Sequence, residues 1–188
     1  MTTALSVVAF DPGRTLARAA EGDEAAFALL VRRHESMVFG LAWNALGDGA
    51  LAEEVAQEVF LRLYRRLGTI ESEEHLVSWL RRVTGQRVVD VVRRRRPALP
   101  LDALPEPAQP AGPSEPEPLL GRRLRRLVRG LPAEQRVALL LRYQEEMAPR
   151  EIAAALDLPV NTVKSRVQRA LATLRRQLAV RGAEETAS

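Results

Sequence analysis

Hydrophobic residues recur at helical spacing near the C-terminal end of the chain and predict two consecutive helices there. The first runs from Arg150 to Leu156 and ends before Pro159, because the residue preceding a proline disfavours helical geometry. The second begins at Pro159 or Asn161 and carries an apolar stripe at spacings of three and four residues. The stripe consists of Val163, Val167, Leu171, Leu174 and Leu178.

A tight turn and a small residue indicate how these two helices pack. Ala153 faces inward with Ile152 and Leu156, and permits the close approach that a helix-turn-helix requires. The other side of the second helix carries donors able to reach phosphates and base edges in a major groove. These donors are Thr162, Lys164, Ser165, Arg166, Gln168 and Arg169. We interpret the pair as a DNA-binding helix-turn-helix; the alternative is an ordinary helical hairpin with a solvated basic face.

The first half of the chain has three further helical patterns. One follows the N-cap residue Asp23, with Phe27, Leu30, Val31, His34, Val38, Leu41 and Ala42 on one face. After the break at Gly47 to Gly49, a second stripe consists of Leu51, Val55, Val59 or Ala56, Leu63 and Leu67. A third helix runs from His75 to Arg96 and ends at Pro97. Its inward positions are Leu76, Trp79, Leu80, Val83, Val91 and one of Val88 and Arg87. Residues before Arg14 are expected to fray.

Two surfaces of this half are strongly charged. The second helix exposes Glu53, Glu54, Gln57, Glu58 and Arg62, which by themselves indicate a solvated helix supported by a Glu58–Arg62 pair. The third helix carries Arg81, Arg82, Gln86, Arg87 and Arg93 to Arg96. Two interpretations fit these residues equally well. They form a strip that binds a nucleic-acid backbone, or they are solvated cations at a helix C-terminus, where they interact favourably with the helix dipole.

A proline-rich segment separates the two halves. Residues Pro97 to Pro118 contain eight prolines, four acids and no basic residue, so they predict an extended tether of roughly 25 to 70 Å. We expect the tether to be disordered and the two domains to tumble separately. The second domain opens with a helix from Leu119 to Gly130, and Val137, Leu140 and Leu141 follow on a helix facing the helix-turn-helix. After Leu178 the tail is too polar to add an element.

Composition supports an all-α fold. The chain has 188 residues, of which 46% are hydrophobic and only 4% aromatic, and Ala, Leu, Val and Arg dominate. The net charge of +4 conceals separate acidic and basic segments, which indicates several partners. With no cysteine, disulfides and thiolate catalysis are excluded. No signal peptide or long apolar run is present, so we expect a cytoplasmic protein without membrane insertion. We expect His34 and His75 to bind no metal.

Three stretches together resemble a known family. They are EEVAQEVFLR from Glu53 to Arg62, WLRRVTGQRVVDVVRRRRP from Trp79 to Pro97, and LPAEQRVALLLRYQEEMAPREIAAALDLPVNTVKSRVQRAL from Leu131 to Leu171. They are similar to regions 2 and 4 of bacterial sigma-70 family RNA polymerase sigma factors, in the extracytoplasmic-function (ECF) group. The chain departs from the family pattern at Gly85, where Arg is usual, and at Gln86, where Asn is usual. It also has Glu54 for Asp and Ala56 for an aliphatic residue.

The resemblance implies a role for each surface. Core RNA polymerase, through its β′ clamp helices and β subunit, would bind Glu53, Glu54, Gln57, Glu58 and Arg62. Minus-10 promoter DNA would bind Gln86, Arg87, Arg93, Arg94, Arg95 and Arg96. Minus-35 DNA would bind Arg142, Thr162, Lys164, Ser165, Gln168 and Arg169. An anti-sigma factor is a further family partner, and neither a cofactor nor a catalytic residue is implied.

The implied organisation has two small helical domains. A flexible N-terminus (1–22) precedes region 2 (23–96), the linker (97–118), region 4 (119–180) and a tail (181–188). The main alternative is a helix-turn-helix regulator that is not a polymerase subunit, which would need a dimer surface or ligand pocket in the first half. An enzyme is a remote third class, since the two histidines lie far apart and no glycine-rich phosphate loop occurs.

Overall fold

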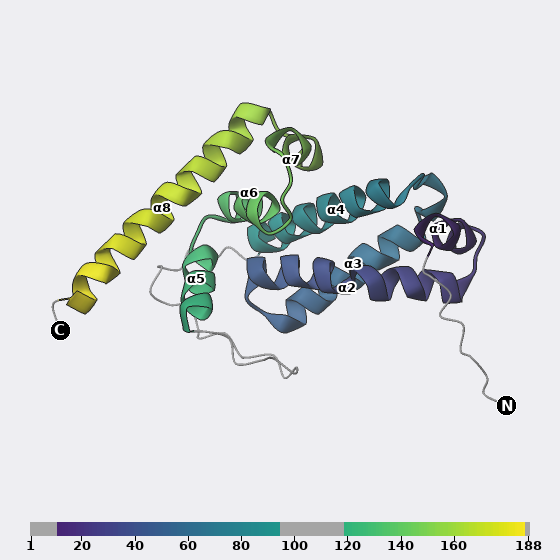
Figure 1. Cartoon of the computed structure of the whole chain (residues 1–188), viewed down its shortest axis with the longest axis horizontal. Coiled ribbons are helices and arrows are strands. Elements are labelled where there is room, and N and C mark those ends of the chain that lie inside the picture. The colour runs from purple at the N-terminus through teal and green to yellow at the C-terminus, as the bar shows by residue number, and fades with distance from the viewer. Residues whose placement is uncertain (1–10, 95–118, 187–188) are drawn as a thin grey trace.

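The computed structural model describes residues 11–94 and 119–186, and the elements in these two ranges are all helical (Figure 1). This confirms the all-α prediction. The first range contains α1 (Pro12–Ala20), α2 (Glu24–Leu46), α3 (Gly49–Tyr64), the 3-10 turn η1 (Leu67–Thr69) and α4 (Glu73–Arg94). The second contains α5 (Leu119–Arg129), α6 (Ala133–Tyr143), α7 (Pro149–Leu156) and α8 (Val160–Thr186).

Side-chain caps begin the predicted helices of the first half. The Asp23 carboxylate accepts a hydrogen bond from the Ala26 amide at 3.0 Å, and the Asp48 carboxylate accepts one from the Leu51 amide at 3.1 Å. Each bond satisfies an amide that has no partner within its own helix. Gly47 ends α2 in the left-handed region (φ 75°), which glycine adopts without the penalty of a Cβ. The break predicted after α2 is therefore confirmed.

Both ends of the described chain contain more helix than the sequence patterns predicted. Residues 12–20 form α1, which buries Leu16. Asp11 caps its N-terminus, and the Asp11 carboxylate accepts a hydrogen bond from the Arg14 amide at 3.1 Å. At the other end, α8 continues through residues assigned to a tail, and Leu178 is 45% exposed instead of facing the core. Figure 1 shows the end of α8 projecting beyond the other helices. Residues with good helix propensity prolong an established helix without core contact, because propagation is much easier than nucleation.

The helix-turn-helix forms as predicted. Asp157 ends α7 in the left-handed region (φ 53°), and the Leu158 amide donates to the Ala153 carbonyl at 2.9 Å. Ala153 is buried, so α7 and α8 approach closely at this point. Pro159 then precedes the first residue of α8. The inward positions Val163 and Leu174 are also buried.

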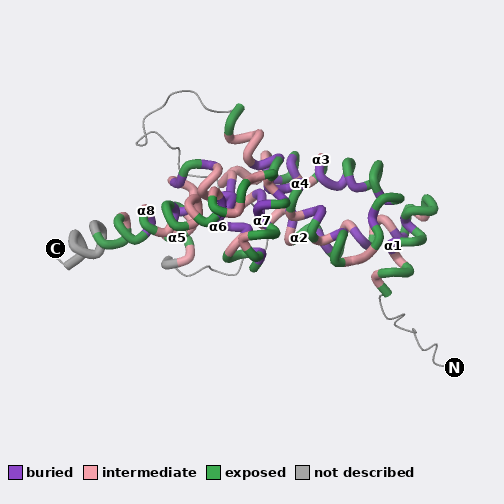
Figure 2. The backbone as a smooth tube through the Cα atoms, turned by 90° about the horizontal axis from the view of Figure 1, so that it is seen from above, coloured by how far each residue is buried: buried purple, intermediate pink, exposed green. Residues whose placement is uncertain are grey.

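The two halves of the molecule share one core. Helices α2, α3 and α4 pack together, and α6 and α7 lie on α4 while α5 lies against α2 (Figure 1). Buried residues run without interruption from the first half into the second (Figure 2). The expectation that the halves tumble separately is therefore wrong for this arrangement, because apolar side chains of α6 and α7 are buried on α4. The predicted tether lies outside the described residues.

Candidate functional site

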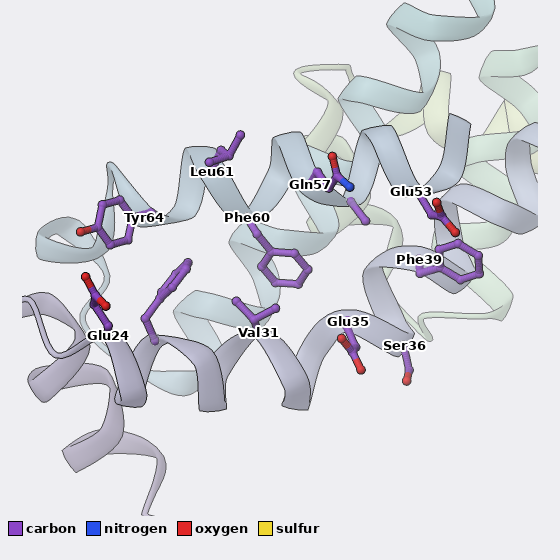
Figure 3. Close-up of a pocket in the computed structure, with 12 residues that line it drawn as sticks. Glu24, Val31, Glu35, Ser36, Phe39, Glu53, Gln57, Phe60, Leu61 and Tyr64 are labelled. Atoms are coloured by element: carbon purple, nitrogen blue, oxygen red, sulfur yellow. The ribbon is translucent and has the colours of Figure 1, made fainter. Parts of the chain in front are cut away.

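An open groove of about 1000 Å³ runs between α2 and α3 (Figure 3). Apolar and aromatic side chains contributed by both helices form most of its lining: Phe27, Val31, Phe39, Ala56, Phe60, Leu61 and Tyr64. The rings of Phe27 and Tyr64 meet edge to face, with centroids 5.1 Å apart. Because Leu61 and Tyr64 are more than half exposed, this apolar strip faces solvent in the described structure.

Acidic and polar side chains border the groove. Glu24 and Glu35 come from α2, and Glu53 and Gln57 come from α3 (Figure 3). The groove therefore combines an apolar floor with a negatively charged border. This arrangement suits a helical partner that carries both apolar and basic side chains.

The five residues predicted to bind polymerase lie on two sides of α3. Glu53, Glu54 and Gln57 are exposed, and Glu53 and Gln57 line the groove. Glu58 is only half-exposed and accepts from Arg62 at 2.7 Å, which confirms the predicted intrahelical pair. Glu58 also forms an ion pair with Arg87 of α4, so its carboxylate ties α3 to α4.

The residues predicted to bind minus-10 DNA lie on α4 in different environments. Arg94 is exposed, and Arg95 and Arg96 lie outside the described residues. Arg87 is buried and paired with Glu58 and with Asp90, the latter at 3.4 Å. Its guanidinium is thus part of the packing between α3 and α4, and in this arrangement it does not face solvent.

Gln86 and Arg93 contact the second half of the chain. The Gln86 side-chain amide donates to the Ala155 carbonyl of α7 at 3.0 Å. Arg93 forms an ion pair with Glu134 at the start of α6, and this hydrogen bond raises the pKa of the Arg93 guanidinium. Two of the predicted DNA-binding residues of α4 therefore have intramolecular partners.

The predicted minus-35 residues cluster at the start of α8, except Arg142. Lys164, Gln168 and Arg169 are exposed, and Thr162 and Ser165 are partly exposed. Arg169 donates to the Ser165 hydroxyl at 3.0 Å and to its carbonyl at 3.2 Å, which orients the guanidinium along the helix surface. These residues lie together on one polar side of the helix.

Arg142 is on α6, away from this cluster. Its guanidinium donates to the Met147 carbonyl at 3.2 Å and lies 5.9 Å from the centroid of the exposed Tyr143 ring. It therefore helps to order the segment between α6 and α7. Its predicted contact with the DNA backbone stays a prediction.

A second set of polar contacts joins the halves near the end of α6. The buried carboxylate of Glu145 accepts from Arg81 of α4 at 3.0 Å. Gln144 donates to the other Glu145 oxygen at 3.0 Å and accepts from Asn44 of α2 at 2.8 Å. This chain of bonds connects three helices of the shared core, and the sequence patterns assigned no role to Glu145.

Two arginines of the second half reach the C-terminal end of α2. Arg136 donates to the carbonyls of Ala45 and Leu131, the latter at 2.9 Å, and Arg129 lies 4.8 Å from the centroid of the Trp43 ring. Burial, with the nearby positive charge of Arg129, lowers the pKa of Arg136 to about 10. Cations at a helix C-terminus interact favourably with exposed carbonyls and with the helix dipole. The sequence pattern of repeated basic residues in α5 and α6 did not predict which of these arginines would contact α2.

Comparisons with known proteins identify a family model in each half of the chain. Residues 30–98 match the family model for Sigma-70 region 2, and residues 121–174 match the model for Sigma-70, region 4. The ECF RNA polymerase sigma factor SigE of Mycolicibacterium smegmatis is 35% identical, over 95% of this chain and 72% of that protein. This chain belongs to the ECF sigma factors of the sigma-70 family.

Other relatives carry the same description. SigW of Bacillus subtilis, also an ECF RNA polymerase sigma factor, is 29% identical over 84% of this chain and 91% of the SigW chain. The ECF RNA polymerase sigma-E factor of Escherichia coli K12 is 34% identical, over 81% of this chain and 86% of that protein.

Two solved structures share the fold. CnrH, solved in complex with the cytosolic domain of CnrY, has a TM-score of 0.65 at 24% identity and covers 90% of this chain and 97% of its own. The sigma factor RpoE of Bartonella quintana, solved with the anti-sigma factor NepR, has a TM-score of 0.62 at 22% identity over 81% of this chain and 94% of its own. None of the helices in the described ranges combines the length and hydropathy that a bilayer-spanning segment needs.

Proposed function

We propose that this ECF sigma-family protein binds core RNA polymerase and directs it to promoters by contacting their minus-10 and minus-35 elements. The observation that carries the proposal is the presence, in one chain, of an exposed acidic-apolar groove and a helix-turn-helix with exposed donors. The family membership supports the same assignment. In this proposal the polymerase supplies the chemistry of RNA synthesis.

The groove between α2 and α3 is the proposed polymerase-binding surface. Glu53, Glu54 and Gln57 project from α3, and the exposed rings and aliphatic side chains beside them offer apolar area for burial. A basic amphipathic helix pair of the polymerase would bury this area while its charges meet the acidic border. In protein interfaces, a few aromatic residues surrounded by polar contacts typically contribute most of the binding energy.

The helix-turn-helix is the proposed reader of the minus-35 element. Lys164, Gln168 and Arg169 are exposed on the first turns of α8, the part of a recognition helix that enters the major groove. Amide and guanidinium groups can form paired hydrogen bonds with base edges, and a lysine contributes a mobile positive charge near phosphates. The basic end of α4 would hold the DNA backbone near the minus-10 element.

Run-off transcription tests the proposal directly. Purified core polymerase is incubated with the full chain and a library of genomic fragments, and transcript ends are sequenced. We expect defined start sites that appear only when the protein is added, with shared motifs upstream. A helix-turn-helix regulator that is not a polymerase subunit would bind DNA fragments without binding core polymerase and would yield no new start sites.

A further inference from the structure

Arg87 lies on the side of α4 that packs against α3. Its side chain is only 9% exposed, and it occupies an inward position together with Thr84 and Val88. Each successive residue of a helix is turned by about 100°, so Arg87 and the exposed Gln86 lie on different sides of α4. The family resemblance assigned Arg87 to minus-10 DNA, but its guanidinium lies within the packing between two helices of the same chain.

The Arg87 guanidinium bridges two carboxylates. One terminal nitrogen, Nη2, donates to Oε2 of Glu58 on α3, and the other, Nη1, lies 3.4 Å from Oδ2 of Asp90 one turn further along α4. An arginine stays positively charged in proteins, and a buried charge is tolerated only with a charged or hydrogen-bonding partner. The Glu58 carboxylate is therefore what makes a buried arginine possible at this place.

The same contact orders the Glu58 side chain. Its other oxygen, Oε1, accepts from Arg62 at 2.7 Å, so each oxygen of the carboxylate has an arginine partner, one from α3 and one from α4. The Glu58 side chain is nevertheless 33% exposed. A carboxylate has about four acceptor positions, so these two bonds leave it able to accept further donors. Two arginines thus hold Glu58 in place while part of its side chain stays accessible.

Glu58 adjoins the surface proposed for polymerase. Residues four apart are neighbours on a helix, so Glu58 lies next to Glu54, and the negative charges of the two carboxylates repel each other. Arg87 brings a positive charge from a second helix to this point and offsets the repulsion. Glu58 therefore extends the acidic surface of α3 as an acceptor with a fixed orientation.

Stability alone does not account for a buried arginine at this position. The Nε of Arg87 is buried and has no hydrogen-bond partner among the described residues. A well-packed apolar side chain often stabilises a fold as much as a buried ion pair does, or more. The arginine instead fixes the carboxylate that it holds, and a group that is already ordered loses less entropy when a partner binds.

We infer that Arg87 is a positioning residue for polymerase binding: it acts through Glu58, which it holds on the acidic surface of α3, and it makes no contact with DNA. The inference rests on the proposed function, because the surface that Arg87 orders is the one proposed for core polymerase. It moves Arg87 from the minus-10 residues to the polymerase-binding residues.

Affinity of the full chain for core polymerase tests this assignment. Arg87→Met removes the charge and keeps a long side chain, and it should weaken binding by about 10-fold, the scale of one lost charged contact. Titration of labelled protein with core polymerase measures the affinity. Arg14→Met, at an exposed site of α1, is the control for net charge and should bind as the unaltered chain does. Unchanged affinity of Arg87→Met would overturn the inference.

A double variant shows whether Arg87 acts through Glu58. If it does, Arg87→Met combined with Glu58→Gln should bind core polymerase no more weakly than Glu58→Gln alone, because residues that act as a unit have non-additive effects. Effects that simply add would show that Arg87 acts by another route.

Stability separates positioning from a purely structural role. Glu58→Gln leaves Arg87 buried without the Glu58 carboxylate and should lower the midpoint of urea unfolding. The double variant removes both charges and should recover much of this loss, whereas its affinity for polymerase should stay low. A pair that only stabilised the fold would recover affinity together with stability, and that result would contradict the positioning role.

Transcription at saturating polymerase separates Arg87 from the DNA contacts. On a promoter found by the run-off experiment, excess core polymerase should restore Arg87→Met to the unaltered level, because its defect lies in forming the complex. The slope of log binding constant against log salt concentration for promoter DNA should also be unaltered at saturation, since no phosphate contact is lost. A defect that persists at saturation would return Arg87 to the DNA-binding residues.

The outcomes distinguish this inference from the proposed function. If the unaltered chain does not bind core polymerase, the proposed function fails and the positioning role fails with it. If the unaltered chain binds and directs transcription while Arg87→Met binds equally well, only the positioning role is overturned.

Discussion

The groove between α2 and α3 and the side of α4 that carries Gln86 and Arg93 belong to the same half of the molecule, yet they differ in their contacts with the second half. The groove is open, with Leu61 and Tyr64 exposed and a border of glutamates. Gln86 and Arg93 of α4 are each bonded to the second half, although both side chains remain exposed. The surface proposed for the polymerase is thus an open apolar groove, whereas two residues of the surface proposed for DNA are tied to the second half and still reach the solvent.

Charge accounts for the contacts between α4 and the second half. The arginines of α4 meet Glu134 and Glu145 from the second half. Helices α5 and α6 also place Arg129 and Arg136 at the C-terminal end of α2.

The largest effect is expected from altering the open surface. Glu54→Arg combined with Gln57→Ala reverses charge beside the groove and should weaken binding to core polymerase by about 300-fold or more, the scale expected when two interface hot spots of about 2 kcal/mol each are lost. Titration of labelled protein with core polymerase measures the affinity. Glu21→Arg is the control for net charge, and equal affinities of the two variants would remove the groove from the interface.

Removing the cation that pairs with a buried carboxylate should destabilise the contact between the halves almost as strongly. Arg81→Ala leaves the Glu145 carboxylate buried without its cation, which costs on the order of 3 kcal/mol when a buried ion pair is broken. Separation of the two halves would return the Glu145 carboxylate to water and relieve this cost. Urea unfolding should therefore show a lower midpoint or a separate early transition. Arg18→Ala breaks an exposed pair with Asp23 and should change stability by less than about 1 kcal/mol.

Substitutions in the two surfaces proposed to contact DNA should cause different defects when the protein acts with polymerase. Arg169→Ala should reduce discrimination between promoters with and without a correct minus-35 element by about 1 to 3 kcal/mol. Arg93→Ala combined with Arg94→Ala should instead impair the opening of duplex DNA. The slope of log binding constant against log salt concentration should also decrease in magnitude by roughly one for each lost phosphate contact. Permanganate footprinting and transcription from matched and mismatched templates measure both. Identical defects on every template would contradict the division.

The smallest effect concerns the packing beneath the groove. His34 of α2 is buried, and burial holds its pKa below the ordinary value of 6.5 although Glu73 opposes the shift. Protonation therefore favours the unfolded chain, and stability should fall as the pH drops below about 6.5, by at most about 1.4 kcal/mol per pH unit. Urea unfolding at several pH values measures the slope. His34→Gln should flatten it, and an unchanged slope would assign the dependence to other groups.

Local patterns in the sequence were sufficient for most helices and for the composition of both binding surfaces. Asp23, Asp48 and Gly47 mark helix boundaries through their own side chains or backbone, so neighbouring residues alone predict them. The turn before Pro159 and the small Ala153 similarly predicted the helix-turn-helix. Helix α1 was missed because its apolar residues are few and become meaningful only when Leu16 packs on the first half.

Only the tertiary structure decided which predicted surface is accessible. A polar or basic residue on a helix has the same local pattern whether it faces DNA, solvent or another helix of the same chain. Gln86, Arg87 and Arg93 acquired intramolecular partners from residues 29 to 69 positions away, at separations that no periodic pattern reports. The sequence determined the helices and their chemistry, and the packing of α6 and α7 on α4 determined that the two halves share a core. That fit depends on the shapes of side chains brought together from distant segments, which is why local periodicity could not predict it.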